Sequence, residues 1–326
     1  MKSILKSGQY RHTENMTSEE WVRVAAPATT SNIGPGFDTF GLAIQEPYDI
    51  VEGRKIPSGM VITEVTGPDA EDIPRDPEKN SVSIAAAEVL RRSGADFGLE
   101  LKIHKGIRPC SGIGSSGASA AGGAYLAYLL SGKKLSLNEI VMCAAKAEGV
   151  TSGSVHADNV APCIMGGFTI IRSYEPFEVI RIDPPADLGL VVALPDVMVP
   201  TIEARKVLPE EVPVKDLVFH VGHAATLVYA MTKDDLPLIG RSVADAVFEP
   251  ARAHLVPHLK EAEVAAMSHG ALVSFLGGSG PCVMAFYDKR THKGEIIGSA
   301  VKQVYTDAGM KCDIWVTSCG PGCKEI

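Results

Sequence analysis

The feature that most constrains this chain is a glycine- and serine-rich segment that leads directly into a long run of small apolar residues. The segment reads PCSGIGSSGAS over residues 109–119, and the run AAGGAYLAYLL continues to Leu130. Glycines allow the backbone to curl until several N–H groups converge, and small side chains let a following helix pack closely on a sheet. Because a helix N-terminus attracts anions, the pattern predicts a phosphate-binding loop at the start of a tightly packed helix.

Two other motifs share part of this pattern. Gly112, Gly114 and Gly117 fit G-x-G-x-x-G, but a dinucleotide fold places that loop directly after a strand, with an acid about 20 residues later. Here residues 105–111 intervene, and the first later acid, Glu139, is explained as a helix cap. The absence of G-x-x-x-x-G-K-[ST] excludes a P-loop NTPase. A plain glycine turn at the head of a packed helix remains the structural alternative.

Hydrophobic periodicity predicts helices and strands throughout the chain, and therefore an α+β fold class. Asn80 or Ser81 is the expected cap of one helix and Gly94 its stop, while Ser136 and Glu139 form a capping box for another. We expect strands at 22–25, 48–52, 60–66, 99–104, 168–172, 189–193, 271–276, 282–287 and 312–316. We expect helices at 81–93, 136–148, 214–231, 236–243, 257–269 and 293–307, and one that runs from the glycine-serine loop to residue 130. Gly149 is expected to end the helix at 136–148.

The length of 326 residues favours two lobes, since one core seldom organises so long a chain. Residues 1–20 are polar and charged, and we expect a flexible N-terminal extension there rather than a signal peptide or anchor. The sequence Tyr-Glu-Pro at 174–176 is the expected lobe boundary, which gives an N-terminal lobe at 21–175 and a C-terminal lobe at 176–326.

Charge and cysteine content exclude several classes of protein. The formal net charge of −8 argues against a nucleic-acid binder, and the longest apolar runs are too short to span a bilayer. The sequence therefore predicts a cytoplasmic protein that binds no nucleic acid or membrane. Seven scattered cysteines indicate reduced thiols without a disulfide framework, and the lack of a C-x-x-C pair predicts no structural zinc.

A second polar cluster reads EGVTSGSVHADNVAP from Glu148 to Pro162. Glu148 is a suitable hard ligand for Mg²⁺. His156 taken alone is more often structural, and Asp158 and Asn159 could be turn residues. Their concentration on one loop favours a functional role.

Three further features lie in the second half. Arg205 in PTIEAR and Arg252 in EPAR could hold a carboxylate through the guanidinium fork, with surface salt bridges as the alternative. The segment GGSGP at 277–281 lies between two expected strands, where it is either a hairpin turn or a close approach of backbone to a ligand.

In this order, the motifs resemble those of the GHMP kinase superfamily, whose signatures are an early polar loop, a P-x-x-x-G-L-G-S-S-A loop and a C-terminal glycine-rich loop. The resemblance covers about residues 22–316. The segments APATTSNIGPGFDTFG, GSVHADNVAPC, PTIEAR, EPAR and GGSGP are similar to those of members that phosphorylate homoserine, and H-x-D-N-V-A-P is the most discriminating. This chain has two residues between Pro109 and Gly112 where the superfamily has three, and Gly117 where alanine is usual.

The resemblance implies a two-lobe fold, with an N-terminal lobe like the second domain of ribosomal protein S5 and a ferredoxin-like C-terminal lobe. It also implies Mg²⁺, a homodimer, and transfer of phosphate from ATP to L-homoserine, giving O-phospho-L-homoserine on the route to threonine. The resemblance also implies roles for individual residues. The residues that would contact ATP are Asn80, Pro109, Ser111, Gly112, Ile113, Gly114, Ser115, Ser116, Gly117, Ala118 and Ser119, and Mg²⁺ would bind Ser116 and Glu148. Catalysis would involve Asn32, Asn159 and Thr201, and the substrate would contact Asn32, Asp38, His156, Asn159, Arg205 and Arg252.

A mechanistic hypothesis follows from one of these positions. Mevalonate-type relatives are thought to use an aspartate as base where this chain has Asn159, and an amide cannot accept a proton in that way. We therefore expect the γ-phosphate itself to take the proton. A kinase for another alcohol, a nucleotide-linked oxidoreductase and a catalytically silent binding protein remain the alternatives at this stage.

Overall fold

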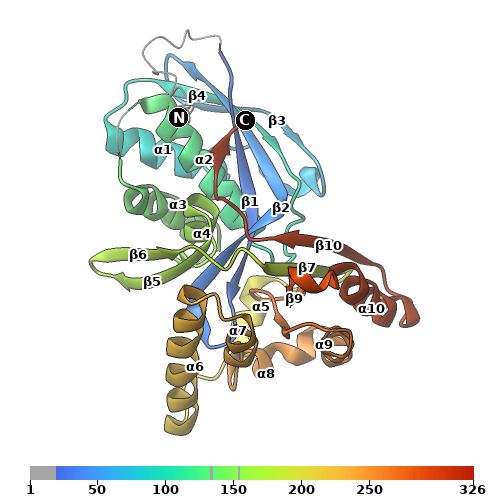
Figure 1. Ribbon diagram of the computed structural model, residues 1–326. Helices are drawn as coiled ribbons and strands as arrows, with labels where there is room; N and C mark the ends of the chain where they lie inside the picture. The colour runs from blue at the N-terminus through green and yellow to red at the C-terminus, as the bar shows by residue number, and fades with distance from the viewer. Residues whose placement is uncertain (1–19, 133–134, 153–154) are drawn as a thin grey trace, which may run out of the picture.

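The computed structural model describes residues 20–132, 135–152 and 155–326. The predicted extension at 1–20 therefore lies outside the described residues except for its last residue. Two sheets and their helices form a mixed α and β structure, as expected (Figure 1). The strands are β1 Val22–Asn32, β2 Gly36–Ile56, β3 Met60–Thr66, β4 Gly98–His104, β5 Phe168–Tyr174, β6 Phe177–Ile182, β7 Leu188–Pro195, β8 Val273–Leu276, β9 Val283–Asp288, β10 Cys312–Ser318 and β11 Lys324–Glu325. The α-helices are α1 Ser81–Ser93, α2 Ser115–Ser131, α3 Leu137–Ser152, α4 Val160–Met165, α5 Thr201–Lys206, α6 Val214–Thr232, α7 Leu236–Ser242, α8 Phe248–Arg252, α9 Leu259–Ser268 and α10 Gly294–Asp307.

The larger sheet has the order β11-β1-β2-β4-β3, and the hairpin β5–β6 joins it through β2. The expected lobe boundary at 175/176 falls in the turn of that hairpin, between two strands of this sheet. A division that keeps strands β1 to β6 in one lobe lies at 183–187, between β6 and β7. The last strand, β11, returns from the C-terminal half to pair with β1.

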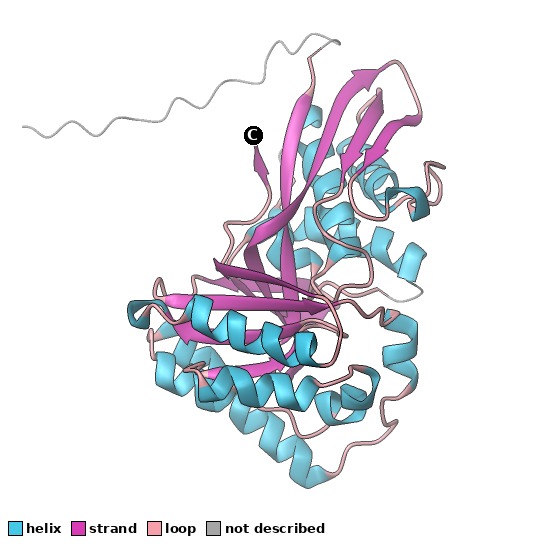
Figure 2. Ribbon diagram, turned by 90° about the vertical axis from the view of Figure 1, so that its right-hand side faces the viewer, coloured by secondary structure: helices cyan, strands magenta, loops and turns pink. Residues whose placement is uncertain are grey.

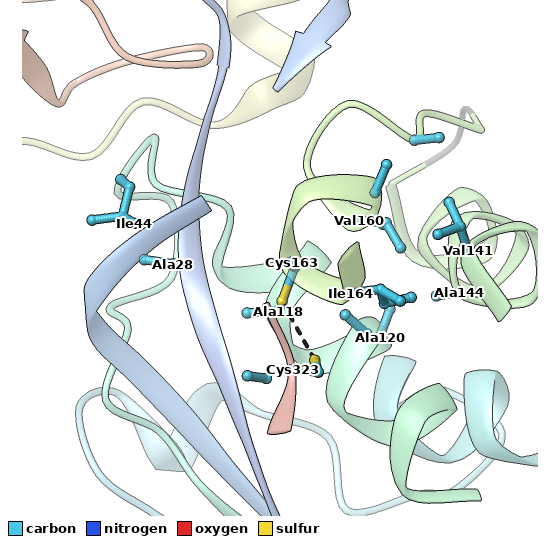
Figure 3. Close-up of a cluster of buried hydrophobic side chains, with 14 of the residues drawn as sticks. Ala28, Ile44, Ala118, Ala120, Val141, Ala144, Val160, Cys163, Ile164 and Cys323 are labelled. Carbon is cyan, nitrogen blue, oxygen red and sulfur yellow. Dashed lines mark hydrogen bonds between the residues drawn. The ribbon is translucent and has the colours of Figure 1, made fainter. Parts of the chain in front are cut away.

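The predicted small-residue helix, α2, lies between the larger sheet and the other helices of its lobe. Figure 2 shows these helices gathered on one face of the sheet. A Cβ on Gly122 would lie 2.7 Å from Val51 Cγ2 on β2, and one on Gly123 would lie 2.1 Å from the backbone oxygen of Val82 on α1. The glycines therefore allow close contact on both sides of α2. Alanines of α2 also pack against α3 and α4 (Figure 3).

The smaller sheet has the order β10-β7-β9-β8, all antiparallel. Its strands follow the chain order β-α-β-β-α-β, which is the ferredoxin-like arrangement predicted for the C-terminal lobe. The central strand β7 is buried along its whole length, with alternate residues on opposite faces. Leu190 and Val192 pack in the core shared with α6 and α7, and Val191 and Ala193 pack with α9 and α10.

Local signals predicted some element ends and missed others. Asn80 caps α1 by accepting a hydrogen bond from Val82 N, and Gly94 ends it in a left-handed conformation. The expectation that Gly149 ends α3 is wrong: the helix continues to Ser152, and a Cβ at Gly149 would lie 2.7 Å from Val155 Cγ2. This glycine serves close packing. The short elements α4, α5, α8 and β6 were not expected. The three helices have only five or six residues, which is too few for a clear helical period. In the described ranges, no helix is long and apolar enough to cross a membrane.

Candidate active site

A cavity of about 620 Å³ opens where the loop before α2 meets the start of β2 and the helices α5 and α8. Most of the residues that the sequence predicted for the ATP, metal and substrate sites line this cavity. Those lining it are Asn32, Asp38, Asn80, Pro109, Ser111, Gly112, Gly114, Ser115, Ser116, Ser119, Glu148, His156, Asn159, Thr201, Arg205 and Arg252. A second cavity of about 620 Å³, lined by residues 318–322 and neighbouring segments, contains none of them.

Three residues predicted to wrap the phosphates do not line the cavity. Ile113 and Ala118 are fully buried in the core. Gly117 faces Asn159, since a Cβ on it would lie 3.0 Å from that residue's Cβ. Ile113 and Ala118 therefore anchor the loop in the core, and Gly117 lets it pack closely against Asn159.

The glycine-serine segment has the geometry of an anion cradle. Gly112 and Gly114 have φ values of 77° and 70°, a left-handed conformation that favours glycine. Gly114 is the N-cap of α2, and its carbonyl accepts the first intrahelical bond, from Ala118. The N–H groups of the first turn, from Ser115 onward, have no carbonyl to bond within the helix. The positive end of a seventeen-residue helix thus faces the cavity.

The serines of this segment have different surroundings. Ser116 is exposed at the start of α2, and Ser111 is buried with no hydrogen-bond partner for its Oγ among the described residues. Ser115 donates to the Ile107 carbonyl at 3.0 Å, and Ser119 accepts from Lys105 Nζ at 2.9 Å. Ser111 and Ser116 are therefore the hydroxyls available to a ligand.

A buried ion pair lies beneath the cradle. Lys105 Nζ contacts the Asp49 carboxylate, and the two side chains are 1% and 0% exposed. The same ammonium reaches the Ser115 carbonyl at 3.3 Å. Asp49 also accepts from the N–H groups of Gly106 and Ile107, both at 3.0 Å. This network links β2 and the end of β4 to the first turn of α2.

The two glycine-rich loops touch each other directly. A Cβ on Gly112 would lie 2.7 Å from the Gly280 oxygen and 2.8 Å from the Gly277 oxygen. Gly278 N donates to the Ser31 carbonyl at 3.3 Å. The segment 277–281 is a β8–β9 turn, as one sequence alternative held, and it also closes against the cradle.

Asn32 holds the turn between β1 and β2. Its Oδ1 accepts from Asp38 N at 3.0 Å, and its Nδ2 donates to the Gly278 carbonyl at 2.7 Å. Asn32 and Asp38 both have positive φ, 71° and 53°, which costs energy outside glycine. One hydrogen on Asn32 Nδ2 remains for a substrate, so the residue lines the cavity and also connects the lobes.

Asn159 has its side-chain amide oriented by β1. Thr29 Oγ1 donates to its Oδ1 at 2.9 Å, and its Nδ2 donates to Ser31 Oγ at 3.1 Å. The preceding residue, Asp158, lines the cavity with a buried carboxyl. Burial first, and then the negative charge of Asp38, raises the pKa of Asp158 to about 6, against a hydrogen bond from Ser31 that lowers it.

Asp38 and Arg205 form an ion pair inside the cavity, although 167 residues separate them in sequence. Arg205 Nη2 donates to the two carboxylate oxygens at 2.9 and 3.2 Å, while its Nε has no partner among the described residues. His156 Nδ1 lies 3.6 Å from Asp38 and 3.4 Å from Arg205 Nη2. Burial lowers the pKa of His156, the positive Arg205 lowers it further, and Asp38 opposes this.

Arg252 is the second guanidinium of the site. It is 3% exposed and donates to the carbonyls of Ala204 at 3.1 Å and Gly278 at 3.3 Å. The ring of Phe37 lies 5.2 Å from Arg252 and 5.6 Å from Arg205, and stacks on Phe248 at 3.9 Å. The aromatic pair supports both cations from one side.

The cavity also contains donors suited to a divalent cation. Glu148, near the end of α3, and Ser116, at the start of α2, both line it. Burial first, and then nearby Asp158, raises the pKa of Glu148 to about 8. A buried carboxyl of this kind is stabilised as the anion by a cation, and hard oxygen ligands suit Mg²⁺. No group of three or more His, Cys, Asp or Glu that could hold a metal occurs in the described ranges, so a cation here would take further oxygens from phosphate and water.

Four residues of the site were missed or undervalued from sequence. Ser31, Phe37 and Lys105 were not singled out, and Asp158 was noted as part of a polar loop without a role of its own. The contacts of all four depend on segments distant in sequence.

Comparison with known families defines the class. The model for the GHMP kinases N terminal domain matches residues 80–167, and the model for GHMP kinases C terminal matches residues 227–307. The matched ranges contain the cradle with Glu148 and Asn159, and the C-terminal glycine loop with Arg252. The fold is therefore that of a GHMP kinase, and the candidate site lies largely within the matched ranges.

Individual relatives narrow the assignment from the GHMP kinases to one family within them. The chain is 43% identical to a homoserine kinase of Methanococcus maripaludis over 93% of this chain and 97% of the relative. It is 40% identical to a homoserine kinase of Pyrococcus abyssi over 93% and 98% of the two chains. A crystal structure of homoserine kinase from Cytophaga hutchinsonii superposes with a TM-score of 0.90 at 36% identity, covering 96% of this chain and 99% of the other. The chain belongs to the homoserine kinase family.

Proposed function

We propose that this protein transfers the γ-phosphoryl group of ATP to the hydroxyl of L-homoserine, with Mg²⁺ bound by Ser116 and Glu148. The observation that carries the proposal is the placement of Asp38, Arg205 and Arg252 in the same cavity as the cradle at the N-terminus of α2. An amino acid needs a partner for each of its charged ends, and a phosphoryl donor needs converging N–H groups. One cavity provides both.

The acceptor end of the site matches the two charges of an amino acid. The Asp38 carboxylate would take the ammonium group, and Arg205 would release one of its two contacts to it and bind the substrate carboxylate. The Arg205 Nε, which has no partner among the described residues, and the adjacent Arg252 support that assignment. His156 and Thr201 line the space between them.

The donor end supports positioning and charge stabilisation, which are the main needs of phosphoryl transfer. The backbone of residues 111–116 would bind the phosphates, with Ser111 Oγ as a further donor and Asn80 near the base. When bound, Mg²⁺ would neutralise charge on the transferring group. Asn159, held by Thr29 and Ser31, would donate its remaining amide hydrogen to the reacting hydroxyl. This keeps the hypothesis that the phosphate takes the proton.

The dinucleotide alternative does not fit the fold. A Rossmann unit needs parallel strands on either side of the helix that follows the glycine loop. In this chain α2 leads into α3 and α4, and the next strand, β5, pairs antiparallel with β2. The glycine spacing therefore reflects the cradle, and no observation favours an oxidoreductase.

An ADP-release assay across homoserine, mevalonate, pantoate, shikimate and galactose tests the proposal. We expect homoserine to be the preferred alcohol, with activity dependent on Mg²⁺. Asp38→Asn should raise the KM for homoserine by about 10- to 100-fold, since a hydrogen bond to a charged group contributes about 1.5–3 kcal/mol, and should leave the KM for ATP nearly unchanged. Preference for another alcohol would overturn the substrate assignment.

Asp69→Asn is a matched control for that substitution. Asp69 has the same φ of 53° as Asp38 and an arginine neighbour, Arg108, at 3.5 Å, but it does not line the cavity. We expect wild-type kinetics from it. Equal effects of the two substitutions would show that loss of a charged turn residue, and not loss of a substrate contact, explains the change.

We also propose a homodimer, a cytoplasmic location and a role in making threonine, as the family resemblance implies. Support for the dimer comes from α6, where Val214, Leu217, Val218 and Val221 are each more than half exposed in the single chain. Light scattering should give twice the chain mass, and Val218→Glu should halve it. Val61→Glu, at an exposed valine on β3, is the control and should leave the dimer intact.

A further inference from the structure

Two cysteines far apart in sequence lie in contact inside the N-terminal lobe. Cys163 is on α4, and Cys323 lies three residues before the end of the chain. Their Sγ atoms are 3.9 Å apart across a separation of 160 residues, and both side chains are buried (Figure 3). Nothing in the proposed kinase reaction uses either thiol.

The backbones are already close enough for a disulfide. Cys323 N donates a hydrogen bond to the Cys163 carbonyl at 2.7 Å. With standard bond lengths, the two Cα atoms then cannot be more than about 6.6 Å apart, which lies within the range that disulfides span. Bond formation needs the sulfurs to approach by about 2 Å, and Cys163 would give up its S–H contact to the Pro27 carbonyl.

The path of the C-terminal segment is fixed around this contact. Gly320 N donates to the Ala43 carbonyl at 2.8 Å, and Gly320 accepts from Gly167 N at 3.0 Å. A Cβ on Gly322 would lie 2.6 Å from Gly166 N. The segment therefore holds Cys323 against α4 without any rearrangement of the fold.

We propose that Cys163 and Cys323 form a reversible disulfide that cross-links the C-terminal segment to α4. The oxidant is a small-molecule disulfide such as oxidised glutathione. The Cys323 thiolate attacks one glutathione sulfur and releases one reduced glutathione. The Cys163 thiolate then attacks the sulfur of Cys323 and releases the second, so each cysteine gives up one proton while one glutathione disulfide is reduced to two thiols.

The order of these steps follows from the surroundings of the two thiols. Cys323 is 7% exposed on a terminal segment, whereas Cys163 is fully buried on a helix. Burial first, and then the hydrogen bond with Cys323, holds the pKa of the Cys163 thiol well above its ordinary value. Oxidation should therefore be slow in the native protein and begin at Cys323.

The test uses the full-length native protein incubated with oxidised glutathione, then alkylated under denaturing conditions and analysed by peptide mass spectrometry. We expect two of the seven cysteines to resist alkylation, a linked peptide pair that contains Cys163 and Cys323, and recovery of all seven thiols with dithiothreitol. The melting temperature should rise by several degrees in the oxidised form, since a long loop is closed in the unfolded chain. Turnover should not change.

Variants localise the bond and control for folding. Trypsin leaves Cys312, Cys319 and Cys323 on one peptide, because no Lys or Arg lies between residues 312 and 323. Cys319→Ser and Cys312→Ser should keep the linked pair, and Cys323→Ser, close to the chain end, should abolish it. Seven alkylated cysteines in oxidised wild type, a linked pair that survives Cys323→Ser, or a lower melting temperature on oxidation would each overturn the proposal.

Discussion

Replacing Lys105 with methionine should destabilise the protein far more than loss of an exposed ion pair. The Lys105 and Asp49 side chains are almost fully buried, and removal of one partner leaves an uncompensated charge in the core. Such losses cost about 3–5 kcal/mol, a large part of a typical total stability of about 5–15 kcal/mol. Lys105→Met also removes the contacts of Nζ to Ser119 Oγ and the Ser115 carbonyl, so the first turn of α2 should become less ordered.

Urea unfolding measures this effect, with tryptophan fluorescence and circular dichroism as probes. Trp21 reports near the N-terminal lobe, where Lys102 lies 4.4 Å from its ring, and Trp315 reports from β10. We expect the midpoint of Lys105→Met to fall by roughly 1 M, for a slope near 3 kcal/mol per molar urea. The KM for ATP should also rise, because the cradle begins at the turn that Lys105 contacts.

The control is Arg23→Met, which removes the pair formed by Arg23 and Glu52 on strands β1 and β2. The Arg23 side chain is 48% exposed, and exposed pairs contribute about 0–1 kcal/mol. Adding Asp49→Asn to Lys105→Met should restore part of the stability, since no buried charge then remains. If Lys105→Met and Arg23→Met lose the same free energy, or if the second substitution restores nothing, the account of the buried pair is wrong.

Two further predictions concern the cradle and the metal. Gly114→Ala should lower kcat/KM by at least about 100-fold, because the added Cβ would lie 2.0 Å from Thr29 Oγ1 and 2.9 Å from Asn159 Oδ1. The control is Gly132→Ala, at a φ of 61° with open space around it, which should lose only about 1–2 kcal/mol of stability to backbone strain and keep its activity. Equal kinetics of the two variants would contradict the steric argument. Burial raises the pKa of Glu148 to about 8, and Mg²⁺ at the proposed site would have to displace the carboxyl proton below that pH. Calorimetry should therefore show proton release on binding and a Mg²⁺ affinity that falls up to tenfold per unit as pH drops below 8. A pH-independent affinity would remove Glu148 from the proposed metal site.

Local residue patterns predicted those helix ends that depend on residues only a few positions away. The cap at Asn80, the stop at Gly94 and the helix after the cradle follow from backbone conformation and side-chain size. The patterns failed where a glycine serves packing, as at Gly149, and where a helix has fewer than two turns, as α4 does. The predicted lobe boundary at 175/176 lies in the turn of the hairpin β5–β6. No local pattern could show that this hairpin pairs with β2, because the paired residues are more than 100 positions apart.

Most of the candidate site was named from sequence, but its arrangement was not. The residue types at Arg205, Asp38 and Asn159 indicate which chemical groups they could bind. Their roles in one reaction came from a family resemblance. The structure adds that Ser115 and Ser119 hold the loop through Lys105 and the Ile107 carbonyl. No spacing rule in the sequence could separate these serines from Ser116.

The sequence by itself determined which chemical groups are available. It provides a loop whose glycines permit left-handed turns, a helix whose small side chains allow it to be buried, and side chains that can hold phosphate, carboxylate and ammonium groups. Only the tertiary structure decided which of these groups meet. Asn32 bonds to Gly278 across 246 residues and Asp38 to Arg205 across 167. Backbone propensity acts over a few residues, whereas such contacts depend on how two sheets pack their buried faces together, and that packing is a property of the whole chain.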